Sequence, residues 1–471
     1  MPDLHFSSVL DQAAWVNSGQ LSARQLVEHS LERIEALNPT LNAFHVVLAH
    51  EALAVADQLD VETAAGTSRG PLHGVPLAIK EENDIAGIPT TFGTGANLTP
   101  ATADSVVVER LRSAGAIIIG STRMPEFGLW PYTESVSGGW TRNPWNPEFS
   151  PCGSSGGTAA AVASGMVAAG IGGDGGGSIR LPASWCGLFG LKPQRGRVST
   201  SPASDLWRSL GTVGPITRTV ADSALIYDVL AGHEHADRFR AAALTDSFSS
   251  AIEAAASGES ARRLRIAVSA KNPSGGPRPN EASRDALTEA VHALRELGHD
   301  VVQIDPHYPA VSAEFILQVA GGARDEVTNL DAPEKLEQRT RDLLRLTKPL
   351  EGLGTWAERS GMKKGREFLS AFFSQYDLLM TPTTPTEAQP VGQLDGLSAI
   401  RTVMKATPVA SYTSIWNVIG NPAAAVPMGF TDAGLPRSVQ IVGPADGELT
   451  LLRLCAELEQ LRPWAHHHPA I

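Results

Sequence analysis

The chain has 471 residues, of which 42% are apolar and 19% are charged, and its formal net charge is −12. This apolar fraction is enough for a sizeable core, and glycine and proline together stay below the level of low-complexity chains, so the composition indicates a folded globular protein. The negative charge argues against a nucleic-acid-binding surface, which needs clustered lysine and arginine, and we expect a small-molecule partner instead.

Signals for export and membrane insertion are missing. The first residues, MPDLHFSSVLDQ, have no basic start and no apolar run, so we expect no secretory signal. The uncharged stretch 149–173 could span a bilayer by its length, but it is mostly glycine, alanine and serine, and we expect it to be buried in protein. The three cysteines, Cys152, Cys186 and Cys455, are too few and too scattered for a disulfide framework or a zinc site, which fits a cytoplasmic protein.

The first 65 residues predict helices. Ser7 and Ser22 are suitable N-caps, and LVEHSLERIEAL has apolar residues at helical spacing. From about residue 71, short apolar runs bounded by glycine or proline alternate with amphipathic segments, which is typical of strands interleaved with helices. Predicted strands lie at 75–79, 116–120, 265–269, 301–305, 377–381 and 438–442, and predicted helices at 105–113, 221–230 and 281–297.

The polar stretch 233–263 is rich in serine, alanine and arginine, and we interpret it as a linker or an insertion. No internal repeat interrupts the alternation of strands and helices. We therefore predict one large α/β domain, 1–471, in which both halves of the chain contribute strands.

The segment 150–193 is the densest in possible motifs, and twelve of the 45 glycines fall between Gly153 and Gly190. Gly170, Gly172 and Gly175 match G-x-G-x-x-G, the pattern of a dinucleotide-binding turn. The context disfavours this function, because GGSIRLP follows where a helix should open, and no suitable acid stands about 20 residues on.

A second motif in this segment is G-x-S-x-G, formed by Gly153, Ser155 and Gly157. It would make Ser155 the nucleophile of an esterase of the α/β-hydrolase type, in which a strand ends at the serine and a helix begins. The helix is credible because TAAAVAS follows, but NPWNPEFSP places three prolines where the strand is needed.

A third interpretation uses the turn GDGGGS. Backbone amides of a glycine-rich turn can converge on one oxygen, as in an oxyanion hole, and Ser178 on the same turn could attack a carbonyl carbon held there. The chain has eight lysines, and Lys80, at the end of the run GVPLAIK, is the only one in the first 191 residues. An amine in a desolvated site can act as a base, although a plain salt bridge from Lys80 to Glu81 or Glu82 is the alternative.

The stretch 144–198, with GVPLAIK before it and NPAAAVPMGFTDAGLPRSVQIVG after it, resembles the amidase signature family of serine hydrolases. The resemblance extends from the region of Gly74 to Glu459. It implies a large mixed β-sheet sandwiched between helices and hydrolysis of the C–N bond of an amide or carbamate. We also expect a monomer or homodimer that needs no metal or cofactor and has no nucleic-acid or membrane partner.

The resemblance also implies the site residues. In this family the counterpart of Ser178 attacks the carbonyl, that of Ser154 relays the proton through a cis Gly-Ser bond, and that of Lys80 is the terminal base. The oxyanion hole corresponds to the backbone amides of Gly175, Gly176, Gly177 and Ser178, and the acyl pocket to the region of Phe127, Gly128 and Trp130.

Three positions depart from the family pattern. Gly173 stands where threonine or serine is common, Gly175 where a bulkier residue is common, and Cys152 at a frequent glycine position. Asp174 and Arg180 match the pattern, and we interpret them as charges that hold the turn.

The substrate is left open by the sequence. The resemblance allows small acyl or aryl amides, carbamates and nylon-type oligomers. A stand-alone amidase is favoured, because FILQVAGGARDEVTNL has no counterpart of the tyrosine-rich segment of the glutamyl-tRNA amidotransferase A subunit. The alternatives are the esterase centred on Ser155 and a non-catalytic subunit of the amidotransferase type.

Overall fold

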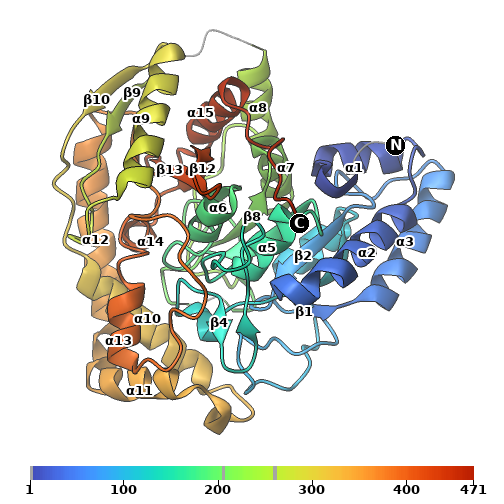
Figure 1. Ribbon diagram of the computed structural model, residues 1–471, viewed down its shortest axis with the longest axis horizontal. Coiled ribbons are helices and arrows are strands. Elements are labelled where there is room, and N and C mark those ends of the chain that lie inside the picture. Colours follow the sequence, from blue (N-terminus) through green and yellow to red (C-terminus); the bar gives the residue numbers. More distant parts are fainter. Residues whose placement is uncertain (1–3, 204–206, 258–261) are drawn as a thin grey trace.

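The computed structural model describes residues 4–203, 207–257 and 262–471, and among these residues 11 strands form one mixed sheet (Figure 1). In sheet order the strands are β1 (Phe44–Val47), β3 (Ile117–Thr122), β2 (Pro76–Lys80), β6 (Ala169–Gly173), β8 (Val213–Thr217), β7 (Phe189–Lys192), β12 (Ala423–Phe430), β13 (Pro436–Val442), β11 (Leu378–Pro382), β9 (Arg265–Val268) and β10 (Asp300–Gln303). Strands from both halves of the chain therefore hydrogen-bond into one sheet, and the α/β architecture with a large mixed sheet is confirmed.

Helices surround this sheet, and a two-stranded ribbon, β4 (Glu134–Ser135) with β5 (Gly139–Trp140), lies outside it. The α-helices are α1 (Val9–Asn17), α2 (Ala23–Leu41), α3 (Ala49–Ala64), α4 (Val106–Ser113), α5 (Gly156–Ala163), α6 (Arg180–Cys186), α7 (Val220–Leu230), α8 (Phe248–Ala256), α9 (Glu281–Glu296), α10 (Ser312–Val327), α11 (Gln338–Thr347), α12 (Gly354–Phe373), α13 (Ala399–Ala406), α14 (Ser414–Ile419) and α15 (Glu448–Leu461). Short 3-10 helices are η1 (Leu4–Phe6), η2 (Glu126–Gly128), η3 (Pro333–Lys335) and η4 (Lys348–Leu353).

The apolar core lies on both faces of the sheet. Buried side chains of α4, α7, α8, α9 and α15 pack on one face, and those of α2, α3, α5 and α6 pack on the other. Along β2, Leu77 and Ile79 belong to the first cluster and Ala78 to the second, as the alternation of a strand requires. Figure 1 shows α2 and α3 at one end of the molecule and α10 to α13 at the other.

Most predicted elements are present, with two differences near the N-terminus. All six predicted strands and the three predicted helices lie within one or two residues of their expected bounds. Ser22 caps α2 as expected, but α1 is capped by Ser8 and not by Ser7, because Ser8 forms a capping box with Asp11. The N-terminal segment predicted to be helical also contains β1, a strand of only four residues.

Part of the stretch 233–263 is built into the core. Its described residues include α8, which packs between α7 and α15 and buries Phe248, Ala251 and Ala255. Residues 258–261 of this stretch lie outside the described residues.

The glycine-rich strand β6 lies directly against α5. A Cβ atom at Gly170 would lie 2.7 Å from Thr158 Cγ2, and one at Gly172 would lie 2.8 Å from Ser155 Oγ. These two glycines of the G-x-G-x-x-G pattern thus allow close packing of the helix on the strand. Every residue from Ser150 to Cys186 is buried, and among the described residues no helix is long and apolar enough to cross a membrane.

We expect Gly170→Ala to lower the free energy of unfolding by about 1–3 kcal/mol, because the added methyl group overpacks the contact between β6 and α5. Urea unfolding followed by circular dichroism measures this change. Gly352→Ala is the control, since nothing lies within 4 Å of a Cβ atom at that position. Equal stability of the two variants would contradict the packing role of Gly170.

Candidate active site

Lys80 is the last residue of β2, and the fold directs it toward the start of α5. Because side chains alternate along a strand, Lys80 shares the face of Ala78, which packs with α5. The lysine is 1% exposed, and its Nζ donates a hydrogen bond of 2.8 Å to Ser154 Oγ. The same Nζ lies 3.0 Å from Glu82 Oε2. Both interactions considered from the sequence, the contact with a serine and the salt bridge, are therefore present together.

Ser154 lies just before α5, next to the lysine. Its peptide bond with Gly153 is cis, and the residue is 1% exposed. A Cβ atom at Gly128 would lie 2.8 Å from Ser154 Oγ, so this hydroxyl sits directly behind Gly128.

Ser178 lies in the turn between β6 and α6. Because β2 and β6 are parallel neighbours, their ends at Lys80 and Gly173 meet at the same edge of the sheet. The Ser178 carbonyl accepts a hydrogen bond of 3.3 Å from the Ser155 amide, which ties this turn to the start of α5. Gly128, which lies against Ser154, and Ser178, the predicted nucleophile, line the same pocket.

Asp174 organises the turn that carries Ser178. Its Oδ1 accepts a hydrogen bond of 2.8 Å from the Gly177 amide, and its Oδ2 accepts one of 3.2 Å from the Ile179 amide. Gly177 has a φ of 128°, a conformation that favours glycine.

The amides predicted for the oxyanion hole are therefore not equivalent. That of Gly177 already has a carboxylate acceptor, whereas among the described residues the amides of Gly175, Gly176 and Ser178 donate to no protein atom.

The charge of Asp174 is balanced by Arg180, and neither side chain is exposed. Two hydrogen bonds of 2.9 Å join the guanidinium to the carboxylate. Burial alone would raise the pKa of Asp174, but the charge and hydrogen bonds of Arg180, with a hydrogen bond from Asn417, lower it to about 2. Arg180 also donates to Gln440 Oε1 (2.6 Å) and to the Thr413 carbonyl (3.1 Å), so the pair joins the turn to the C-terminal half of the sheet.

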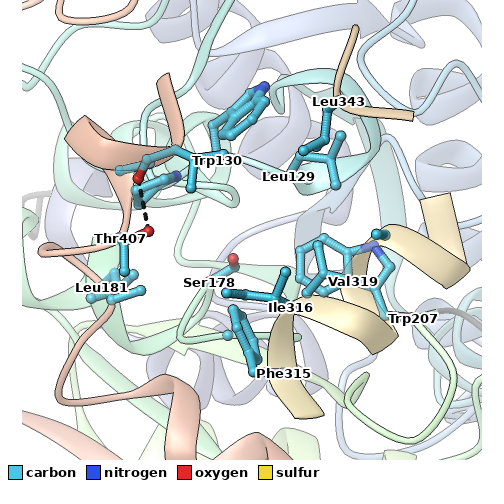
Figure 2. A pocket seen from close by; sticks show the side chains of 17 residues that line it. Leu129, Trp130, Ser178, Leu181, Trp207, Phe315, Ile316, Val319, Leu343 and Thr407 are labelled. Atoms are coloured by element: carbon cyan, nitrogen blue, oxygen red, sulfur yellow. Dashed lines mark hydrogen bonds between the residues drawn. The ribbon is translucent and has the colours of Figure 1, made fainter. Parts of the chain in front are cut away.

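The pocket in front of Ser178 is apolar and has no charged side chain in its lining. Figure 2 shows Ser178 among side chains from separate parts of the chain. The lining residues are Gly128, Leu129, Trp130, Pro131, Gly176, Ser178, Leu181, Trp207, Phe315, Ile316, Val319, Ala320, Leu343, Val403, Ala406, Thr407 and Ala410.

The predicted pocket residues fall in different places. Gly128 and Trp130 line the pocket, whereas Phe127 lies outside its lining. The Phe127 ring packs in another apolar cluster with Ala96 and Leu336, because a φ of 50° turns the chain at this residue.

Two aromatic residues of the pocket were missed from the sequence. Trp207 packs so closely on the turn that a Cβ atom at Gly175 would collide with its indole ring, and a Cβ atom at Gly176 would lie 2.8 Å from Phe315 Cζ. Gly322 also leaves space for Trp207, because a Cβ atom at Gly322 would lie 2.7 Å from Trp207 Cα. The paired glycines at 321 and 322 in FILQVAGGARD were the one sequence signal of a close approach.

The competing nucleophiles have structural roles. Ser155 is fully buried, and its hydroxyl donates to the Gly173 carbonyl at 3.2 Å. The Cys152 thiol contacts the Pro131 carbonyl at 3.1 Å, and burial raises its pKa well above the usual value, which disfavours a thiolate. Within the described ranges, no group of three histidine, cysteine or acidic side chains could hold a metal ion.

Comparisons with known proteins identify the family. The family model "Amidase" matches residues 25–452. The "Putative amidase AmiB2" of Mycobacterium tuberculosis is 41% identical over 474 residues, which cover 100% of this chain and 99% of that protein. The "Acylamidase" of Rhodococcus erythropolis is 34% identical over 481 residues, covering 99% and 98% of the two chains. The solved structure of 6-aminohexanoate cyclic dimer hydrolase with substrate has a TM-score of 0.90 at 28% identity and covers 99% of both chains. The chain belongs to the amidase signature family and is an amidohydrolase.

We expect Asp174→Asn to lower the free energy of unfolding at pH 7 by about 3–5 kcal/mol, because it leaves the buried Arg180 without its counter-charge. The pKa of Asp174 is about 2 in the folded protein, below the unfolded value of about 3.9. The carboxylate therefore stabilises the fold fully above about pH 4, and this contribution is lost as the pH falls toward 2.

Thermal unfolding of both proteins from pH 3 to 7 tests this expectation, since the difference between them should narrow at the acidic end. Asp57→Asn is the control, because it removes an ion pair with Arg24 in which Asp57 is 56% exposed. A difference that stays constant with pH would contradict the assigned role of the Asp174 charge.

Proposed function

We propose that the protein hydrolyses neutral amides or carbamates that carry a bulky apolar group, through an acyl-enzyme on Ser178. The observation that carries this proposal is the position of Ser178, at the wall of an uncharged apolar pocket and next to the hydrogen-bonded pair of Lys80 and Ser154. The family membership supports the reaction class.

In the proposed first half-reaction, Ser178 Oγ attacks the carbonyl carbon of the substrate. Its proton moves to Ser154 Oγ, which passes its own proton to the amine of Lys80, the terminal base. The carbonyl oxygen becomes negative, and the free amides of Gly175, Gly176 and Ser178 are the groups available to stabilise it.

The C–N bond then breaks. The leaving nitrogen takes a proton from Ser154, which is reprotonated by Lys80, so that the amine departs neutral and the acyl group stays on Ser178. Water attacks the acyl-enzyme with the same groups in the same roles, and Ser178 regains its proton as the acid leaves.

The pocket supports the choice of substrate. Each lining residue is uncharged, and the hydroxyl of Thr407, which lines the cavity with Ser178, donates to the Val403 carbonyl. A charged group placed there would lose its hydration without a partner of opposite charge. Apolar acyl or aryl groups therefore fit better than charged linear oligomers, in line with the relative that is named an acylamidase.

The proposed location is a reducing compartment such as the cytoplasm. Cys152, Cys186 and Cys455 are all buried free thiols, and this state supports the proposal.

We expect Ser178→Ala, Ser154→Ala and Lys80→Ala each to lower kcat for an acyl p-nitroanilide by about 10³-fold or more, because each removes a member of one proton-transfer chain. Release of p-nitroaniline measures the rate, and Ser178→Ala should also escape labelling by a fluorophosphonate. Ser155→Ala is the matched control and should keep the nucleophile. Full activity of Ser178→Ala, or loss of labelling only in Ser155→Ala, would overturn the mechanism in favour of the esterase.

We expect Phe315→Ala to lower kcat/KM for aryl and long-chain acyl amides by about 10-fold or more, because it removes an aromatic wall worth roughly 1.5–3 kcal/mol of apolar contact. Acetamide, which does not reach that wall, should change little. Ile400→Ala on α13 is the control, since Ile400 is 60% exposed and does not line the pocket. An equal loss for acetamide and the aryl amides would argue against the pocket as the acyl site.

A further inference from the structure

The Glu82 carboxylate is buried beside Lys80, a position that is unfavourable for an acid unless it interacts with the lysine. Its side chain is only 7% exposed, and Oε2 lies 3.0 Å from Lys80 Nζ. Its other oxygen, Oε1, is buried and has no hydrogen-bond partner among the described residues. A buried carboxylate with a free oxygen costs stability, so stability does not explain its presence.

The neighbouring acid is bound differently. Glu81 Oε2 accepts a hydrogen bond of 2.5 Å from Thr91 Oγ1, and its Oε1 accepts one of 2.7 Å from the Met124 amide. The two carboxylate oxygens of Glu81 therefore bind Thr91 and the backbone of Met124, whereas Oε2 of Glu82 contacts Lys80.

Gly173 provides the space that Glu82 occupies. A Cβ atom at Gly173 would collide with Glu82 Oε1, and the three atoms nearest to that Cβ position all belong to the Glu82 carboxylate. The φ of Gly173 is not in the left-handed region, so its backbone conformation would accept alanine. The Glu82 carboxylate therefore accounts for the glycine at this position.

Few other charges act on the lysine. Glu81 follows it on the chain, with His45 of β1 3.9 Å from the Glu81 carboxylate and Arg123 after β3 also near that carboxylate. The turn after β6 contributes Asp174 and Arg180, which neutralise each other.

The remaining surroundings leave Glu82 as the main counter-charge of Lys80. The α5 sequence GGTAAAVA has no titratable side chain. On its outer side Glu82 lines a groove with the acids Asp84, Asp104, Asp325 and Glu326, which do not touch Lys80.

We propose that Glu82 is a positioning residue that holds Lys80 against Ser154 and stabilises the protonated lysine formed during the reaction, and that Gly173 is glycine in order to admit its carboxylate. This inference rests on the proposed function of Lys80. Glu82 takes no proton from the substrate and acts only through the lysine.

The first test is the pH dependence of kcat in Glu82→Gln, a variant of nearly the same shape. Removing the negative charge 3.0 Å from Nζ takes away the counter-charge of the lysine cation formed in the reaction. The acidic limb of the activity profile should therefore move to lower pH by about one unit or more. The plateau should fall about 10-fold because the lysine is held less firmly. Asp104→Asn, in the same groove but without contact to Lys80, should leave the profile unchanged.

The second test is a double-mutant cycle of Glu82→Ala, Gly173→Ala and the double variant. Gly173→Ala should reproduce the loss and the pH shift of the Glu82 variants, because its methyl group displaces the carboxylate. In the Glu82→Ala background the same change should cost less than about 2-fold, since the obstacle is gone.

Three results would overturn the inference. They are a wild-type pH profile in Glu82→Gln, a loss in that variant without any shift of the acidic limb, and additive effects in the cycle. Thermal unfolding of each variant identifies any that fail to fold, and Gly173→Ala in the Glu82→Ala background then decides the question. Failure of the proposed function would look different, because Lys80→Ala would then remain active.

Discussion

The buried ion pair of Asp174 and Arg180 is the interaction on which the site depends. Burying two charges is costly unless every donor and acceptor is satisfied. Here the Asp174 carboxylate accepts hydrogen bonds from backbone amides of its own turn. The Arg180 guanidinium donates hydrogen bonds to Gln440 on β13 and to the Thr413 carbonyl. The pair therefore fixes the shape of the turn and its place against the second half of the sheet in one network. Because the Gly177 amide is used by this network, the amides left free on the turn, among the described residues, are those of Gly175, Gly176 and Ser178.

The glycine excess around the site follows from close neighbours. Gly170 and Gly172 allow α5 to lie against β6, Gly173 makes room for a carboxylate, and Gly175 makes room for the Trp207 indole. Each missing side chain is replaced by an atom from another part of the chain. The motif that resembles a dinucleotide-binding turn is thus explained by packing, and the resulting density holds a polar site in place inside a core that is otherwise apolar.

The sequence predicted those features that depend on residues close together in the chain. Six of the eleven strands of the described sheet were recognisable as short apolar runs, whereas β1, β6, β7, β8 and β12 were not predicted. The resemblance to the amidase signature family pointed to Lys80, Ser154 and Ser178 as a group. The predictions were weakest where the cause lies far away. Trp207 and Phe315 reach the pocket from loops and helices with no pattern of their own, and the use of the Gly177 amide by Asp174 is a matter of turn geometry. The cap at Ser8 was missed by one residue because two serines stand side by side and only the second pairs with Asp11.

The two roles considered for Lys80 do not compete. A lysine that must accept a proton in a buried site becomes a cation there, and a cation without a counter-charge is unfavourable in a low dielectric. The apolar pocket offers none, because its lining is uncharged. The compensating charge therefore has to lie on the far side of the lysine, which is the position of Glu82. In the proposed cycle the proton moves away from the apolar pocket and toward this carboxylate. The site can then bind a neutral apolar substrate on one side and hold the charge created by catalysis on the other.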